Sequence, residues 1–257
     1  MKKTALFFLI LLMAAFSAPA AQQRETLTLD AAGCASLRIE CGAGALKVQG
    51  DDTLERIEVS AVLTVQGIAE SELPGFRKEY VILTLEKSGD RAVLTASIDS
   101  GHWLERLFDH GRDARIDLDI RLPRRLALAV DDGSGDLEIR GCDGGLRLED
   151  GSGDARLAEI KGRVRIDDGS GSLYLDAVGG DIEIEDGSGD IELKGAGGNV
   201  DIADGSGEIA VFQALGSVTV EDGSGDIVID GVEKDVTITE AGSGGVRIRN
   251  VKGKVTE

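Results

Sequence analysis

The sequence predicts an all-β protein: a single-chain parallel β-solenoid of 18-residue two-strand coils with an irregular N-terminal cap. The first observation is a tetrapeptide, Asp-Gly-Ser-Gly, that recurs at a constant spacing of 18 residues. A fixed short period is the signature of a solenoid. The second observation is a pattern of paired apolar residues inside each period. The third is a composition with 36 glycines and only 4% aromatic residues, which is typical of a fold with many tight turns.

Residues 1–20 are predicted to be a signal peptide for export. Two lysines form its positive region, an apolar stretch runs from Ala5 to Phe16, and small residues at positions 18 and 20 favour cleavage before Ala21. An uncleaved membrane anchor is the alternative, but the apolar stretch is too short to span a bilayer comfortably. We therefore expect a periplasmic or secreted protein with no membrane span after cleavage.

The chain is strongly acidic. Loss of the two signal-peptide lysines takes the formal net charge from −19 to −21 at pH 7. Such a chain repels nucleic acids and anionic lipids, so neither is an expected partner. Its charged residues are interspersed with apolar ones, which argues against disorder.

Residues 21–66 are expected to form N-terminal strands and a first coil-like unit. Residues 41–50 (CGAGALKVQG) match residues 186–195 (DGSGDIELKG) in the positions of turn and apolar residues. Cys34 and Cys41 flank an alternating segment whose ends, if it is extended, lie beyond disulfide reach. We predict small buried side chains there rather than a disulfide. With Cys142 the cysteine count is odd, which leaves at least one thiol unpaired within the chain.

Residues 67–115 are expected to be a capping insertion, a lid over the open strand edge of the first coil. The pattern breaks at 67–80 and again at 101–114, where Trp103, Leu104, Leu107 and Phe108 have helical spacing. Alternating residues in and around the insertion predict further strands. These strands cover residues 57–65, 81–85, 93–98 and 116–122.

Residues 116–257 are expected to form the solenoid array. In each half of a period two apolar residues stand two positions apart, as in Ile182 and Ile184, and such pairs point to one face of a strand. A last, degraded tetrapeptide at 241 arrives one residue late. Roughly seven coils, stacked about 4.8 Å apart, make a rod about 34 Å long. Lys252 and Lys254 are expected in the terminal strand, where lysines discourage edge pairing.

The two turns of each coil differ. One is Gly-Ser-Gly, and the other carries a small apolar residue that we expect to close one edge of the core. These small apolar residues are Cys142, Ile160, Val178, Ala196, Ala214 and Val232.

Gly-Ser-Gly-Asp-Ile-Glu-Leu at 187–193, with its relatives, and Ile-Asp-Leu-Asp-Ile-Arg-Leu-Pro at 116–123 resemble a known family. It is the bacterial candidate-adhesin family of β-strand repeats, also called Toastrack, a domain of unknown function. The resemblance covers about residues 37–257. It implies an extracytoplasmic β-solenoid, often associated with envelope-stress or cell-surface systems, and supplies no catalytic residues to carry over.

The first residues of the tetrapeptides are expected to stack in one line, which we call the aspartate column. Like charges about 5 Å apart repel, a bound cation would relieve the repulsion, and Ca²⁺ prefers oxygen-rich turns. The alternative is that each aspartate accepts a hydrogen bond from the backbone two residues on. We predict the turn role and no metal or other cofactor, because an inward apolar residue replaces the acidic ligand of the calcium-binding nonapeptide rolls. The aspartate column is Asp132, Asp150, Asp168, Asp186, Asp204 and Asp222.

A metal or acid–base site at the histidines and a polysaccharide-cleaving site are both disfavoured by the sequence. Both histidines share one loop with three acids, but His110 would lie more than two helical turns from His102, so a solvated polar face is favoured over a metal or acid–base site. Polysaccharide cleavage would need a long cleft with catalytic bases and stacking aromatics, which the outward wall positions do not supply. The loop residues concerned are His102, Glu105, Asp109, His110 and Asp113.

A possible interaction patch comprises Ala210, Phe212 and Val228, which should be outward neighbours in adjacent coils. An exposed apolar cluster on an otherwise charged sheet indicates a partner contact, although scattered apolar surface residues are common. We therefore expect a non-catalytic envelope or cell-surface protein, adhesin-like or associated with envelope stress, whose rigid solenoid face binds a protein or glycan. A calcium-binding scaffold is the alternative, followed by a polysaccharide-active enzyme.

Overall fold

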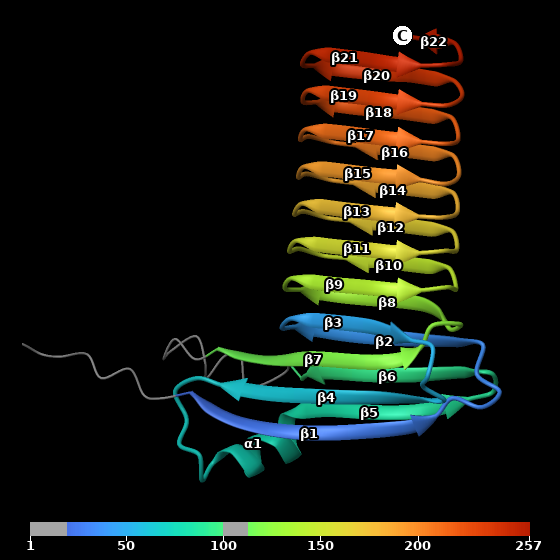
Figure 1. The fold of residues 1–257 in the computed structure, drawn as a ribbon. Coiled ribbons are helices and arrows are strands. Elements are labelled where there is room, and N and C mark those ends of the chain that lie inside the picture. The colour runs from blue at the N-terminus through green and yellow to red at the C-terminus, as the bar shows by residue number, and fades with distance from the viewer. Residues whose placement is uncertain (1–19, 100–112) are drawn as a thin grey trace, which may run out of the picture.

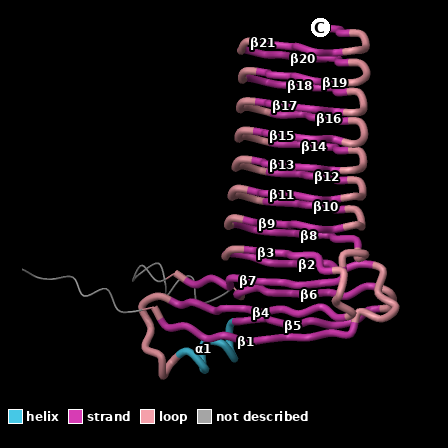
Figure 2. Tube along the Cα trace, viewed as in Figure 1, coloured by secondary structure: helices cyan, strands magenta, loops and turns pink. Residues whose placement is uncertain are grey.

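The computed structural model describes residues 20–99 and 113–257. These residues form a rod with two β-sheet walls, and the chain passes from one wall to the other in every coil (Figures 1 and 2). Each wall is an 11-stranded sheet. Along the array every strand pairs in parallel with its equivalent in the next coil, so the predicted parallel solenoid of 18-residue coils is confirmed.

Sheet A contains, in spatial order, β1 (Ala21–Asp30), β4 (Arg56–Val65), β7 (Ala114–Pro123), β3 (Leu46–Asp51), β9 (Leu137–Cys142), β11 (Ala155–Ile160), β13 (Leu173–Val178), β15 (Ile191–Ala196), β17 (Ile209–Ala214), β19 (Ile227–Val232) and β21 (Val246–Val251). Sheet B contains β5 (Val81–Ser88), β6 (Arg91–Ile98), β2 (Ser36–Ala43), β8 (Ala127–Ser134), β10 (Leu146–Asp150), β12 (Val164–Asp168), β14 (Ile182–Asp186), β16 (Val200–Asp204), β18 (Val218–Ser224), β20 (Val236–Ser243) and β22 (Val255–Thr256). The helix that the structure describes is α1 (Leu73–Tyr80).

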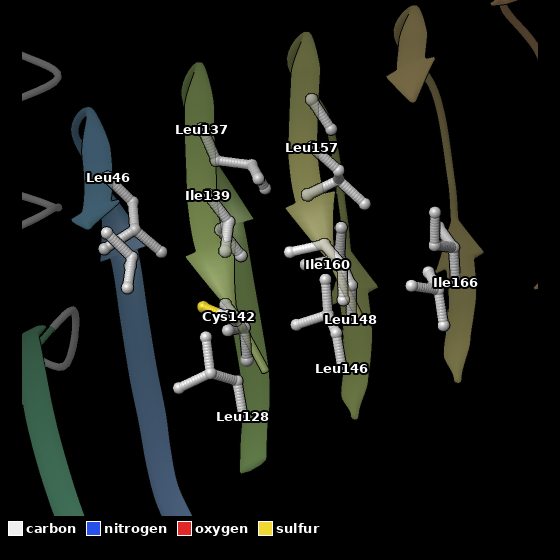
Figure 3. Packing of buried hydrophobic residues seen from close by; sticks show 14 of the residues in the cluster. Leu46, Leu128, Leu137, Ile139, Cys142, Leu146, Leu148, Leu157, Ile160 and Ile166 are labelled. Carbon is white, nitrogen blue, oxygen red and sulfur yellow. The ribbon is translucent and has the colours of Figure 1, made fainter. Parts of the chain in front are cut away.

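The core lies between the two walls. Ile182 and Ile184 of β14 and Ile191 and Leu193 of β15 are all buried, and the residues between them face outward. Figure 3 shows the same arrangement lower in the rod, where inward side chains from successive coils pack against one another. One coil could not bury these side chains alone, so the stability of each coil depends on its neighbours.

The Gly-Ser-Gly turn requires glycine because the coils are so closely stacked. Gly189 has φ +146°, and a Cβ at this position would lie 1.7 Å from the carbonyl oxygen of Gly171 in the preceding coil. Any side chain there would therefore clash with backbone atoms. At the late seventh tetrapeptide the register between β18 and β20 shifts after Val220, which absorbs the extra residue.

The second turn of each coil contains a residue with left-handed backbone. Glycine occupies this position in three coils and a residue with a side chain in four others. The glycines are Gly141, Gly195 and Gly231, and the others are Glu159 (φ 56°), Ala177 (φ 55°), Gln213 (φ 61°) and Asn250 (φ 51°). The kink breaks the alternation of the strand, so the next residue turns inward. The small apolar residues predicted to close the core, from Cys142 to Val232, are all at most 1% exposed.

The N-terminal cap continues both walls beyond the first coil. The predicted first coil is β2 and β3, and the predicted strands of the cap are all present. We expected a lid over the edge of this coil, but the edge is covered by strand pairing instead: β6 pairs with β2, and β7 pairs with β3. The helix α1 then lies against β1 and β5, the outermost strands of the two walls (Figure 1).

Three sequence-based expectations concern the terminal lysines, the signal peptide and the helix around Trp103. Lys252 and Lys254 lie in the turn between β21 and β22, not in a strand, so the prediction that they protect an edge strand is wrong in placement. The signal-peptide features and the helix around Trp103 fall outside the described residues. Within residues 20–99 and 113–257, no helix is both long and apolar enough to cross a membrane.

Candidate functional site

The outward side of sheet A from β9 to β19, which we call the sheet A face, combines apolar and charged side chains in two lines. The lines arise because parallel strands in register place equivalent residues side by side. One line is Glu138, Arg156, Tyr174, Glu192, Ala210 and Val228, and the other is Arg140, Ala158, Asp176, Lys194, Phe212 and Asp230.

The structure brings the three residues of the predicted interaction patch together. Ala210 pairs in register with Val228 of the next coil, and Phe212 follows two residues after Ala210 on the same side of β17. All three side chains are half-buried. Their predicted placement is confirmed, whereas their role in binding stays a prediction.

A groove of about 320 Å³ adjoins this patch on the sheet A face. It is hollowed above Ala158, where a small side chain lies between the larger Arg140 and Asp176. Glu192 and Lys194 line the groove and pair in register with Ala210 and Phe212, so the groove and the apolar patch form one continuous surface.

Tyr174 gives the groove an aromatic wall. The guanidinium of Arg156 lies over its ring, 4.9 Å from the ring centre, and also contacts Asp154 at 3.2 Å. Nearby, Arg140 lies 3.8 Å from Glu138, and the pKa of Lys194 is raised because its ammonium group donates a hydrogen bond to Glu192. The charges of this surface are therefore held by neighbours on the same wall.

The sequence analysis did not identify this groove, but one signal for it was present. Tyr174 and Phe212 are the only aromatic residues in the sequence from 113 to 257. Both stand on strands of the same wall and both face outward, two coils apart.

The aspartate column lies inside the rod, at the edge of the core beside the Gly-Ser-Gly turns. The aspartates pair with one another in register from β8 to β18, and their exposed fractions are between 0% and 7%. The backbone N–H of Ser188 donates to Asp186 Oδ1 at 3.0 Å, and four other coils, those of Asp150, Asp168, Asp204 and Asp222, repeat this contact at 2.9–3.2 Å. The predicted turn role is confirmed.

The second oxygen of each aspartate in the column has no such partner. All six Oδ2 atoms are buried and accept no hydrogen bond. Burial raises the pKa of Asp132 and Asp168 to about 6, and that of Asp150 and Asp186 to about 7. For Asp150 and Asp186 the charges of their two neighbours in the column add to this rise.

The column begins at a cysteine. Cys41 of β2 pairs in register with Asp132, and its thiol donates to Asp132 Oδ1 at 3.3 Å. Burial and this neighbouring acid raise the pKa of Cys41, so the thiol keeps its proton. At the other end Asp222 pairs with Ala241.

The sequence model of the Toastrack DUF4097 family matches residues 43–256. The chain belongs to this family. The match begins at the end of β2 and covers the rest of the first coil, much of the cap and the repeat array of this Toastrack protein. A search of curated proteins returns no match.

Solved structures with low sequence identity and low TM-scores match most of this chain's length. A candidate adhesin from Parabacteroides distasonis is 16% identical with a TM-score of 0.41, over 92% of this chain and 96% of that one. A candidate adhesin from Bacteroides fragilis is 15% identical with a TM-score of 0.33, over 91% and 96%. A candidate cell adhesion protein from Clostridium sporogenes is 13% identical with a TM-score of 0.30, over 91% and 98%.

A calcium-binding scaffold would need a set of acidic ligands, and none is present in the part of this Toastrack chain that the structure describes. No group of three or more histidine, cysteine, aspartate or glutamate side chains is arranged there to hold a metal ion. The acids on the other side of the turn bind backbone instead: Asp154 Oδ1 accepts the N–H of Ser172, and Asp190 Oδ1 accepts that of Glu208, each in the next coil.

The three cysteines and the histidine loop are the remaining candidate residues. Cys34, Cys41 and Cys142 are free thiols; Cys34 and Cys142 are buried, as predicted, and Cys41 is half-buried. Of the histidine loop, His102 to His110 fall outside the described residues, and Asp113 is exposed just before β7.

Proposed function

We propose that this Toastrack protein is a non-catalytic binding module of the cell envelope or cell surface that uses the sheet A face to hold a protein or glycan partner. The observation that carries the proposal is the placement of Tyr174 and Phe212, the only aromatic residues of the array, outward on one wall. Aromatic side chains offer large contact areas at low conformational cost and are enriched in interfaces.

The opposite wall lacks these features. Its outward residues are mainly charged and form ion pairs such as Arg165–Glu183 at 2.5 Å and Arg147–Glu149 at 2.7 Å. A hollow of about 400 Å³ on this wall has no aromatic side chain in its lining, which consists of Ala127, Leu128, Gly145, Leu146, Arg147, Arg163, Arg165 and Glu183. Solvated ion pairs contribute little to binding, so the contrast between the walls favours sheet A.

Rigidity supports the same role. Each strand of the sheet A face pairs with a strand on both sides, and the inward residues beneath it are fully buried. A partner would therefore meet a surface that loses little conformational freedom on binding. Export through the signal peptide at 1–20 would place this surface outside the cytoplasm.

The test compares beads coated with the wild-type protein, with Phe212→Ser and with Ile82→Ser, for retention on intact bacterial cells and on purified surface polysaccharides. Ile82 is an exposed apolar residue (50%) in the cap, so it controls for the loss of surface hydrophobicity. We expect a loss of retention of about tenfold or more for Phe212→Ser and none for Ile82→Ser. Equal retention of all three proteins, or none by the wild type, would contradict the proposal.

Both variants should remain folded. Phe212 faces outward on β17, so its replacement by serine should change the free energy of unfolding by less than about 1 kcal/mol. Thermal melting of each variant checks this before retention is compared.

A further inference from the structure

The aspartate column contains six buried carboxyl groups, each with one oxygen satisfied and one not. Oδ1 accepts a serine N–H of the turn in five of them and the Cys41 thiol in Asp132, whereas Oδ2 accepts nothing and is shielded from solvent. An unpaired buried carboxylate oxygen is costly, because the group has left water without gaining a partner. In every coil with a column aspartate, from β8 to β18, a hydrogen-bond donor or a cation at Oδ2 would therefore be stabilising.

The carboxyl groups from Asp150 to Asp222 are held alike, because Oδ1 accepts the serine N–H of the turn and Oδ2 accepts nothing. The thiol of Cys41, in the preceding coil, contacts Oδ1 of Asp132.

The spacing of the coils decides what fits between two such groups. In-register strands lie about 4.8 Å apart. The two oxygens of one carboxyl group are about 2.2 Å apart, given C–O bonds of about 1.2–1.3 Å. If Oδ2 of one aspartate points along the rod toward the next, about 2.6 Å separates it from Oδ1 of that neighbour. That is the length of an O–H···O⁻ hydrogen bond, and it is too short for an intervening water or Ca²⁺ ion.

We propose that the aspartate column is a proton-binding site, in which each bound proton bridges Oδ2 of one aspartate and Oδ1 of the aspartate in the next coil. Six carboxyl groups have five gaps between them, so the column holds at most five protons, and the thiol of Cys41 donates the first hydrogen bond. The inference is independent of the proposed function, because it concerns the interior of the rod and not its sheet A face.

The charges around the column agree with proton binding. No lysine or arginine among residues 20–99 and 113–257 forms an ion pair with any of the six aspartates. The outward residue directly before each column aspartate is an acid in five of the six coils. These acids are Asp131, Glu149 and Glu185, which pair with arginines, and Asp167 and Glu221; Asp190 lies across the turn. Removal of water and the surrounding acids both favour the neutral form, and the pKa values near 6 and 7 within the column are in line with this.

The test is a titration of the aspartate carboxyl carbons by ¹³C NMR in the folded protein. We expect a group of up to five carboxyls that stay protonated near pH 6, while the outward aspartates ionise near pH 4. Ionisation of every aspartate near pH 4 would overturn the proposal, since the buried Oδ2 atoms would then be satisfied by water or a metal ion.

Two variants distinguish an effect of contacts within the aspartate column from an effect of overall net charge. In Asp186→Asn the amide donates to Asp204 without needing a proton, and it removes one charge between Asp168 and Asp204. The ionisation midpoints of these two neighbours should fall by about one pH unit or more. Asp201→Asn removes the same charge from an outward, exposed position on β16 and should leave them unchanged. Equal shifts in both variants would assign the effect to net charge and overturn the proposal, and Asp204→Asn repeats the test if Asp186→Asn does not fold.

Discussion

Lowering the pH from about 8 to about 5 should stabilise this acidic solenoid strongly. The folded-state pKa values of four column aspartates are raised, so the folded protein binds more protons than the unfolded chain between about pH 4 and pH 7. The resulting stability is fully present below the unfolded-state pKa and is lost as the pH rises through the folded-state pKa. Acidification also lessens the general charge repulsion of this acidic chain, so the comparison with an outward charge variant decides the cause.

The size of the effect follows from the same values. Each acid with a pKa of about 7 gains roughly 2.6 kcal/mol between pH 8 and pH 5, and each with a pKa of about 6 gains roughly 1.4 kcal/mol. Together Asp132, Asp150, Asp168 and Asp186 set a ceiling of roughly 8 kcal/mol. Replacement of Asp186 by asparagine should remove at least roughly 2.6 kcal/mol of this gain, because its own contribution is lost and the pKa values of its neighbours fall.

Urea unfolding followed by circular dichroism measures these free energies at each pH. The outward Asp201→Asn variant, with the same loss of charge, should keep the full pH dependence. Free energies of unfolding that are flat or fall on acidification would refute buried, protonated aspartates, as would equal effects of the two asparagine substitutions.

Two further predictions concern the core and the metal alternative. Ile184→Asp should destabilise the array by several kcal/mol, because Ile184 is 1% exposed between the walls. Glu183→Ala should have little effect, because the outward Glu183 forms only surface ion pairs. Equal melting temperatures of the two variants would contradict the assignment of Ile184 as inward and Glu183 as outward. Millimolar Ca²⁺ and NaCl of matched ionic strength should raise the melting temperature alike; a gain specific to Ca²⁺ and reversed by EDTA, about 2.7 kcal/mol at a hundredfold excess over Kd, would restore the calcium-binding scaffold.

The repeat made most of the fold predictable. A spacing of 18 with two apolar pairs per period fixes the walls, the inward residues and the in-register stacking, and the structure has each of these. The cap was harder to predict, because α1 contains Pro74 and Gly75 and its placement depends on distant contacts. One of these is the pair Arg77–Glu25, at 2.5 Å.

The repeat pattern did not predict that the aspartates are buried or that the second turn contains a left-handed residue. Asp186 stands two residues after Ile184, so strand alternation alone would have placed it inside; its polarity made a turn at the surface the natural reading. Glutamate or glutamine at a left-handed position gives no local signal, and only the glycines at equivalent positions, such as Gly195, reveal it. The groove at Tyr174 depends on which side chains meet across coils, which follows once the register is known.

The central claim is that the sheet A face is the surface that meets a partner. Site-specific photo-crosslinking in intact cells tests it most directly, with a photoreactive phenylalanine analogue placed at Phe212 on sheet A or at Thr219, outward on sheet B one strand later in the chain. We expect a discrete crosslinked partner, identified by mass spectrometry, from position 212 and none from position 219. Crosslinks from position 219 alone, or equal crosslinks from both walls, would contradict the claim.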